Sequence, residues 1–206
     1  MPASSAVADP RVGVELSEED RSRSALYRLL GRILIAPPDA AARSALSGLQ
    51  GDDSPLGQAL NALAAEAARG DHDLEREYHD LFIGLGRGEL VPYGSYYLTG
   101  FLNEKPLALL RRDMARLAIA RRESVREPED HVGAVLEMMA GLIDGSFAVA
   151  PGAIAAQQQF FATHVELVAP RFFADLGQAE AARFYGPVAT VGRLFLEVEA
   201  SAFQMV

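Results

Sequence analysis

Glu127, Asp130 and His131 are the residues of this sequence whose types and spacing best fit chemistry. A carboxylate and an imidazole within a few positions can act as general acid and base, or as metal ligands. The same group also fits a helix start, with Glu127 as the N-cap, Pro128 in the first helical position and Asp130 in the first turn. The residue types alone leave both interpretations open.

The helix predicted to begin at Pro128 is amphipathic. At about 100° per residue its apolar side chains cluster on one side, and Asp130 lies almost opposite. The apolar set is Val132, Val135, Leu136, Met139, Leu142 and Ile143. Any burial of Asp130 must therefore come from another element, such as a loop rich in tyrosine.

The segment from Leu85 to Tyr97 is rich in glycine, proline and tyrosine, a composition that predicts a loop rather than a helix. It carries three phenols within five positions, those of Tyr93, Tyr96 and Tyr97. Such phenols fill a core or line a peptide-binding wall, because each offers apolar area and a polar tip. Ser95 lies among them but lacks the Gly-x-Ser-x-Gly surround of a nucleophile elbow.

Other polar clusters give weaker signals. Metal-ligand types gather on neighbouring turns, but their spacing fixes no common geometry and predicts a solvated polar face. They are Asp71, His72, Asp73, Glu75, His79 and Asp80. Gly84, Gly86 and Gly88 lack the Lys-Ser/Thr that completes a phosphate-binding P-loop. His164 lies among apolar residues, as expected of a hydrogen-bonded core histidine, and the sequence predicts neither a metal nor a cofactor.

Helices are expected to position all of these residues, because no run of strict apolar and polar alternation is present. The predicted N-caps are Ser17, Ser54 and Asp71 or Asp73. Gly84 is expected to end the helix that carries Tyr78, and Gly186-Pro187 to kink or split the last helix. The prediction is a single all-α globule of roughly eight to ten helices, residues 17–206, behind a disordered arm, residues 1–16.

Composition and charge exclude several classes of protein. The 206 residues include 19 Lys and Arg against 28 Asp and Glu, and the net charge of -9 disfavours nucleic-acid binding. Cysteine is absent, which excludes disulfides and thiolate chemistry. No secretory signal or membrane-spanning run is recognisable, so a cytoplasmic location is expected. A helix from about Pro106 carries an arginine-rich face, which is either solvated or a docking surface for an acidic partner.

Three short motifs together resemble a known family. Tyr78, Leu81-Phe82 and Gly84 match Y-x-x-L-F-x-G, Pro92-Tyr93 with Ser95 and Tyr97 match P-[YW]-E-S-x-[YW], and the segment 127–131 matches E-P-x-D-H. In this order, within a helical chain of this length, they resemble the TorD/DmsD/NarJ-like cytoplasmic chaperones of molybdoenzyme maturation. Gly94 departs from the family pattern, which usually has a glutamate there, and the tryptophan often found after the late histidine is missing after His164.

The resemblance implies a TorD-like fold and a chaperone without enzymatic activity. Its partner would be the signal peptide and/or apoprotein of a molybdenum-dependent oxidoreductase, bound during cofactor insertion and before twin-arginine export. The implied peptide-binding residues are Tyr93, Ser95, Tyr97, Glu127, Asp130 and His131. Such a protein would be a monomer or a helix-swapped dimer with no cofactor and no stable membrane insertion. The alternatives are a small metal-dependent hydrolase using Glu127, Asp130 and His131, or a helical adaptor without chaperone activity.

Overall fold

The computed structural model describes residues 16–70, 73–85, 87–121, 127–147 and 153–205. The predicted disordered arm lies outside these ranges except for its last residue. Within them the chain forms ten α-helices and one π-helix and no strand, which confirms the all-α prediction. The elements are α1 (Glu18–Ile35), α2 (Ala40–Ser47), α3 (Pro55–Arg69), α4 (Leu74–Phe82), α5 (Gly94–Thr99), α6 (Lys105–Arg116), α7 (Val132–Asp144), α8 (Ile154–Phe160), the π-helix η1 (Phe161–Val165), α9 (Ala169–Leu176) and α10 (Tyr185–Gln204).

Each of the first four helices begins at a side chain that caps its N-terminus from the residue just before the helix. Ser17, Asp39, Ser54 and Asp73 each accept a backbone N–H three residues on, at 2.8–3.0 Å. These bonds satisfy donors that a helix N-terminus otherwise leaves unpaired. Gly84 has a φ of 60° directly after α4, a left-handed conformation that favours glycine. The predicted caps Ser17, Ser54 and Asp73 and the predicted end of α4 at Gly84 are therefore confirmed.

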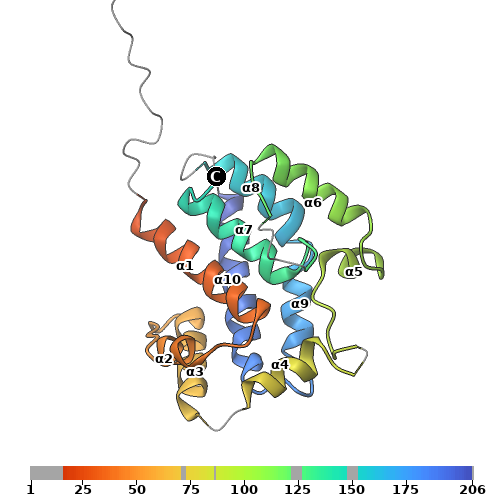
Figure 1. The fold of residues 1–206 in the computed structure, drawn as a ribbon. Coiled ribbons are helices and arrows are strands. Elements are labelled where there is room, and N and C mark those ends of the chain that lie inside the picture. The colour runs from red at the N-terminus through yellow and green to blue at the C-terminus, as the bar shows by residue number, and fades with distance from the viewer. Residues whose placement is uncertain (1–15, 71–72, 86, 122–126, 148–152, 206) are drawn as a thin grey trace, which may run out of the picture.

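The centre of the fold is the packing of α1 against α7, the most extensive contact between two of the described helices. Figure 1 shows α1 running from the edge of the molecule toward α7, which lies near its centre. A Cβ built on Gly31 would lie 2.8 Å from the Gly133 carbonyl oxygen, and one on Gly133 would lie 2.7 Å from the Gly31 carbonyl oxygen. Two glycines thus allow the backbones to approach closely. Arg28 adds an ion pair to Asp144 across the same pair of helices.

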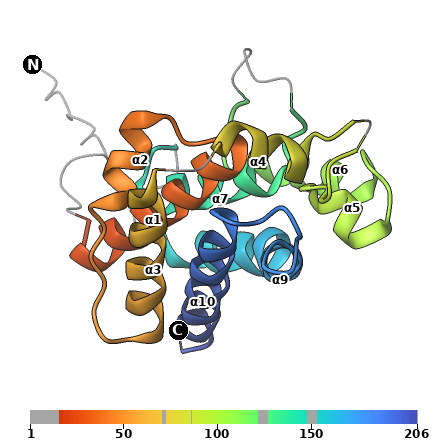
Figure 2. The same cartoon turned by 90° about the horizontal axis from the view of Figure 1, so that it is seen from below.

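The C-terminal helix α10 lies between α3 and α9 (Figure 2). It was expected to be kinked or split by Gly186-Pro187, and that expectation is wrong because the helix begins at Tyr185 and takes the proline in its first turn. The carboxylate of Glu77 supplies the start by accepting the N–H groups of Arg183 and Tyr185 at 2.8 and 2.9 Å. Proline is tolerated there because the first turn has no intrahelical acceptor for its N–H.

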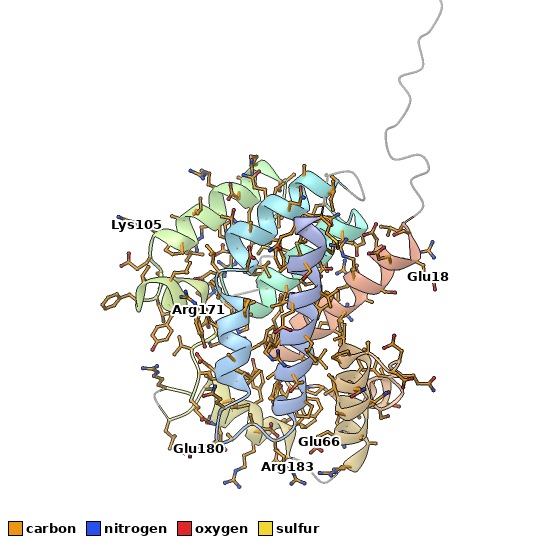
Figure 3. The ribbon with its side chains drawn as sticks, turned by 180° about the vertical axis from the view of Figure 1, so that it is seen from behind. Glu18, Glu66, Lys105, Arg171, Glu180 and Arg183 are labelled. Carbon is orange, nitrogen blue, oxygen red and sulfur yellow. The ribbon has the colours of Figure 1, made fainter. Side chains whose placement is uncertain are left out.

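The ends of α3, α4 and α10 are joined at one end of the molecule. Arg183 forms an ion pair with Glu66 of α3 at 3.7 Å, and both residues are seen together in Figure 3. The Tyr185 hydroxyl donates to the Ile33 carbonyl at 2.9 Å, and its ring packs edge-on against Phe82. These contacts tie α4 and α10 to the end of α1. In the part of the chain that is described, no helix combines the length and apolar character needed to cross a membrane.

Replacing Gly31 with alanine should destabilise the protein by about 1–3 kcal/mol, because the new methyl group would overlap the α7 backbone. Urea denaturation would measure the change. Gly186→Ala is the matched control, since a Cβ at Gly186 meets no atom within 4 Å and alanine favours helix. If Gly31→Ala were as stable as the control, close helix approach would not be the constraint that fixes this glycine.

Candidate functional site

Two short backbone segments are paired at the centre of the candidate site. The Gly94 N–H donates to the Asp130 carbonyl and the Val132 N–H to the Pro92 carbonyl, both at 2.8 Å. The pairing makes Tyr93 and His131 an antiparallel bridge. It joins the segment before α5 to the segment before α7, although these lie more than thirty-five positions apart in the sequence.

The bridge corrects the predicted start of α7. The helix begins at Val132 rather than Pro128, because Asp130 lies in a turn, His131 forms the bridge, and the Val132 N–H donates to Pro92 across it. His131 is the N-cap, with its Nδ1 accepting the Gly133 N–H at 3.1 Å. Glu127 does not cap the helix, and its carboxylate accepts the Tyr93 hydroxyl instead.

The bridge also corrects the predicted loop. The helix α5, Gly94–Thr99, begins inside the predicted loop of residues 85–97 and continues two residues beyond it. Asp130 supplies the missing cap, because its Oδ2 accepts the Ser95 N–H at 2.8 Å. A cap from a distant segment stabilises a helix start without leaving a local signal in the sequence. The expectation that another element buries Asp130 is confirmed, since the residue packs against α5 and is 4% exposed.

Asp130 and His131 face different surroundings although they are consecutive in the chain. The His131 ring lies edge-on to Tyr93, with 5.3 Å between centroids. Asp130 caps α5 and contributes to the lining of a pocket on the other side. The six predicted site residues therefore divide, with Tyr93, Glu127 and His131 in one group and Ser95 and Asp130 in a second. Tyr97 stands apart and donates to Asp175 of α9 at 3.0 Å.

Burial sets the ionisation of the tyrosine and histidine group. Loss of solvation lowers the pKa of His131 to about 4, although the nearby Glu127 and Asp130 oppose the shift. The ring is therefore uncharged at neutral pH, as its role as an acceptor for Gly133 requires. Burial and then Glu127 raise the pKa of Tyr78 to about 12, and its hydroxyl donates to the Ile35 carbonyl at 2.7 Å.

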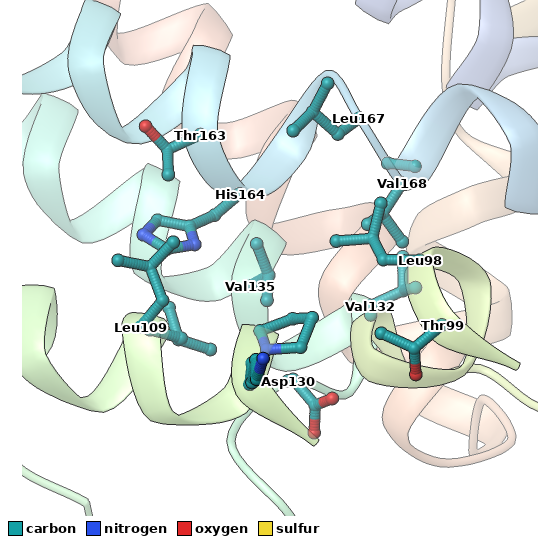
Figure 4. Close-up of a pocket in the computed structure, with 15 residues that line it drawn as sticks. Leu98, Thr99, Leu109, Asp130, Val132, Val135, Thr163, His164, Leu167 and Val168 are labelled. Atoms are coloured by element: carbon teal, nitrogen blue, oxygen red, sulfur yellow. The ribbon is translucent and has the colours of Figure 1, made fainter. Parts of the chain in front are cut away.

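The pocket beside Asp130 has a volume of about 480 Å³ and lies between α5, α6, α7 and the η1–α9 segment (Figure 4). Most of its wall is aliphatic. The lining residues are Gly94, Leu98, Thr99, Lys105, Pro106, Leu109, Leu110, Asp130, Val132, Val135, Thr163, His164, Leu167, Val168 and Ala169. Tyr93 and Tyr97 do not line this pocket, whereas Gly94 of the same segment does.

Leu98, Leu109 and Leu167 are the wall residues that sequence reasoning missed. Leu98 and Leu167 are 40% and 49% exposed, unusual for leucines beside a cavity that is otherwise well formed. Leu109 lies off the apolar stripe that buries α6 in the core. An apolar residue outside the core-facing stripe of a helix was the available signal.

The polar atoms of this second group are only partly satisfied. Ser95 is fully buried, and its Oγ has no hydrogen-bond partner among the described residues. The same holds for Asp130 Oδ1, whereas Oδ2 is bonded to α5. A buried acceptor without a donor costs about 1–3 kcal/mol. An unpaired buried group of this kind calls for an explanation, such as a bound water, an ion or a functional role.

His164 closes the far side of the pocket. Its Nε2 lies 2.9 Å from Asp113 Oδ2 of α6, which confirms the predicted hydrogen-bonded histidine. Burial lowers the pKa of His164, and the Asp113 carboxylate opposes that shift. The residue is carried by η1, a π-helix, and single π turns often occur at functional sites. The histidine thus has a structural role and also contributes to the pocket surface.

The residues first considered for metal chemistry do not converge. Within the described ranges no group of three or more His, Cys, Asp and Glu side chains is arranged to hold a metal ion. Asp71 and His72, two of the candidate ligands, lie outside those ranges.

The arginine-rich face of α6 is partly engaged, because Arg111 binds Glu129 at 2.8 Å.

Because the pKa of His131 is lowered, its burial should make the protein less stable as the pH falls from about 6.5 to 4. The unfolded chain binds a proton over this range that the folded chain resists, so the loss reaches about 1.4 kcal/mol per pH unit. Denaturant titrations of wild type and His131→Asn at several pH values would measure it. Asparagine can still cap α7, and its curve should be flatter. Equal pH dependence would contradict an uncharged, buried His131.

Comparison with known proteins places the chain in a family. Residues 49–174 match the family model described as the nitrate reductase delta subunit. The chaperone protein TorD of Vibrio cholerae is 30% identical over 198 residues, which span 89% of this chain and 82% of the relative. The TorD of Vibrio atlanticus is 27% identical over 177 residues, or 76% of this chain and 79% of the relative.

A solved structure has the same fold. The crystal structure described as a redox enzyme maturation protein from Archaeoglobus fulgidus aligns with a TM-score of 0.56 and 18% identity, covering 92% of this chain and 99% of that one. The family model spans more than half of the chain, and the resemblance inferred from three short motifs is confirmed. The chain belongs to the TorD/NarJ family of redox enzyme maturation chaperones.

Proposed function

We propose that this protein is a cytoplasmic chaperone that binds the signal peptide and/or the apoprotein of a molybdenum-dependent oxidoreductase. It would hold its client while the cofactor is inserted and before twin-arginine export. The protein acts by binding and not by catalysis. Membership of the TorD/NarJ family and the similarity to proteins named as TorD chaperones support this proposal.

The observation that carries the proposal is the aliphatic pocket with a buried carboxyl group at its edge. Its volume of about 480 Å³ lies within the range of ligand sites in proteins. Leu98, Leu109 and Leu167 offer apolar contact, and Asp130 favours positive charge nearby. A twin-arginine signal peptide joins cationic side chains to an apolar segment, which fits this combination.

Magnitudes decide which part of such a peptide carries the affinity. Micromolar binding requires about -8 kcal/mol, and each fully buried Leu, Val or Phe side chain contributes roughly 1.5–3 kcal/mol. An exposed ion pair contributes only about 0–1 kcal/mol and is screened by salt. The apolar segment therefore dominates the affinity, while the cations tune selection and the rate of association.

The hydrolase alternative finds less support in the geometry. Glu127 binds the Tyr93 hydroxyl, Asp130 caps α5, and His131 Nδ1 caps α7. Each group is thus bonded to a different part of the fold, and the three do not face one reacting centre. Tyr93, Glu127 and His131 are proposed to border the peptide site from the other side of the bridge.

Leu167→Ser should weaken peptide binding about tenfold, because Leu167 contributes a half-exposed part of the pocket wall. The protein contains no tryptophan, so fluorescence of a tryptophan-labelled signal peptide reports binding directly. Val198→Ser is the control, since Val198 is 54% exposed and lies on α10 outside the pocket lining. Equal affinities for the two variants would count against the pocket as the peptide site.

Calorimetry on three synthetic peptides tests whether the apolar segment or the arginines carry the affinity. The peptides are a native twin-arginine sequence, one with both arginines replaced by glutamine, and one with two apolar residues replaced by serine. The serine peptide should lose most of the binding, because it removes burial worth roughly 3–6 kcal/mol for two residues. The glutamine peptide should lose little at physiological salt. The reverse order would mean that the site is chiefly electrostatic.

A further inference from the structure

The backbone conformation at Gly94 does not require a glycine. It is the first residue of α5, and its φ lies outside the left-handed region, unlike those of Gly70, Gly84, Gly100 and Gly145. Alanine adopts a helical conformation without steric strain. It also lowers the conformational entropy of the unfolded chain relative to glycine, which stabilises the folded state. Backbone conformation therefore favours a residue with a side chain at this position.

Packing does not require the glycine either. A Cβ built on Gly94 would lie 3.5 Å from the Asp130 carbonyl oxygen, 3.7 Å from Asp130 Cβ and 3.7 Å from Val168 Cγ2. These are ordinary van der Waals distances. They contrast with the 2.7–2.8 Å overlaps that a Cβ on Gly31 or Gly133 would make with backbone oxygen. A methyl group would fit at position 94 without moving its neighbours.

The side chain that Gly94 lacks would point toward the pocket wall. The three atoms nearest to its Cβ position belong to Asp130 and Val168, and both residues line the pocket together with Gly94 itself. Figure 4 shows Val168 and Asp130 among the side chains that line the pocket. Any side chain longer than a methyl group would occupy space between them. The glycine thus keeps one part of an aliphatic cavity open at a cost to the helix.

We propose that Gly94 is a specificity-determining residue, which leaves room in the pocket for a large apolar side chain of the bound peptide, of the size of leucine or phenylalanine. The inference rests on the proposed function and deepens it by naming the side chain that the pocket selects. The walls around the opening are aliphatic, so an apolar side chain gains burial there, whereas a small one leaves a cavity. A larger side chain at position 94 should therefore favour a smaller side chain at the corresponding position of the peptide.

The test pairs protein variants with a peptide series. In wild type, the peptide position whose change from leucine to alanine costs most affinity is identified first. Peptides with alanine, leucine or phenylalanine there are then titrated against wild type, Gly94→Ala and Gly94→Leu. Wild type should bind the leucine and phenylalanine peptides about tenfold more tightly than the alanine peptide. Gly94→Leu should lose that preference or reverse it, and Gly94→Ala should lie between.

Gly186→Ala is the matched control, because Gly186 also lies in the first turn of a helix, has open space at its Cβ and is remote from the pocket lining. It should keep the wild-type preference. Neither alanine variant should melt below wild type, and a markedly lower melting temperature for Gly94→Ala would overturn the premise. Equal weakening of all three peptides by Gly94→Leu, or no change, would overturn the proposal while leaving peptide binding intact. Failure of wild type to bind any peptide would refute the proposed function and this inference together.

Discussion

The backbone pairing of residues 92–94 with residues 130–132 is the constraint on which the candidate site depends. It fixes the start of α7, since Val132 donates to Pro92 rather than to a preceding turn. It brings the Asp130 carboxylate to the first turn of α5, where it caps Ser95. Because α7 is held by α1 through the close approach of Gly31 and Gly133, the pocket wall contributed by α5 is anchored to the centre of the fold.

The same pairing separates two environments. On one side, Tyr93 contacts both Glu127 and His131, and the charge of Glu127 acts on nearby Tyr78, whose hydroxyl binds the end of α1. On the other side, an aliphatic pocket contains a carboxyl group with one unpaired oxygen. Two adjacent residues therefore take part in different interactions: Asp130 caps α5, and His131 caps α7 and contacts Tyr93. The proposed chaperone function uses the apolar side for affinity and the charged residues for selection.

Much of the fold could be predicted because its signals are local. Ser17, Ser54 and Asp73 each accept the N–H group three residues ahead at a helix start, and Gly84 ends α4. Each of these signals can be recognised from a few neighbouring residues. The start of α7 and the existence of α5 could not, because the first depends on the pairing of Val132 with Pro92 and the second on the bond between Asp130 and Ser95, partners that are far apart in the sequence. The cap of α10 by Glu77 was hidden for the same reason.

The candidate site likewise combines residues that a sequence motif can reveal with residues that only the tertiary structure brings together. Motif resemblance identified Tyr93, Ser95, Glu127, Asp130 and His131, and the structure brings these five residues to the two sides of one bridge. It did not identify the leucines of the pocket, since they are apolar residues that only tertiary packing gathers. It also left Gly94 unexplained, and the space beside Asp130 and Val168 gives that departure from the family pattern a physical meaning.

The central claim is that a signal peptide places its apolar segment in the pocket between α5, α6 and α7. The most direct test is photo-crosslinking with a twin-arginine peptide that carries benzoylphenylalanine in its apolar segment, followed by mass spectrometry of the adducts. We predict crosslinks to the pocket wall, at Leu98, Leu109 or Leu167. Adducts confined to the outer faces of α3 or α10, with the pocket residues unmodified, would contradict this claim.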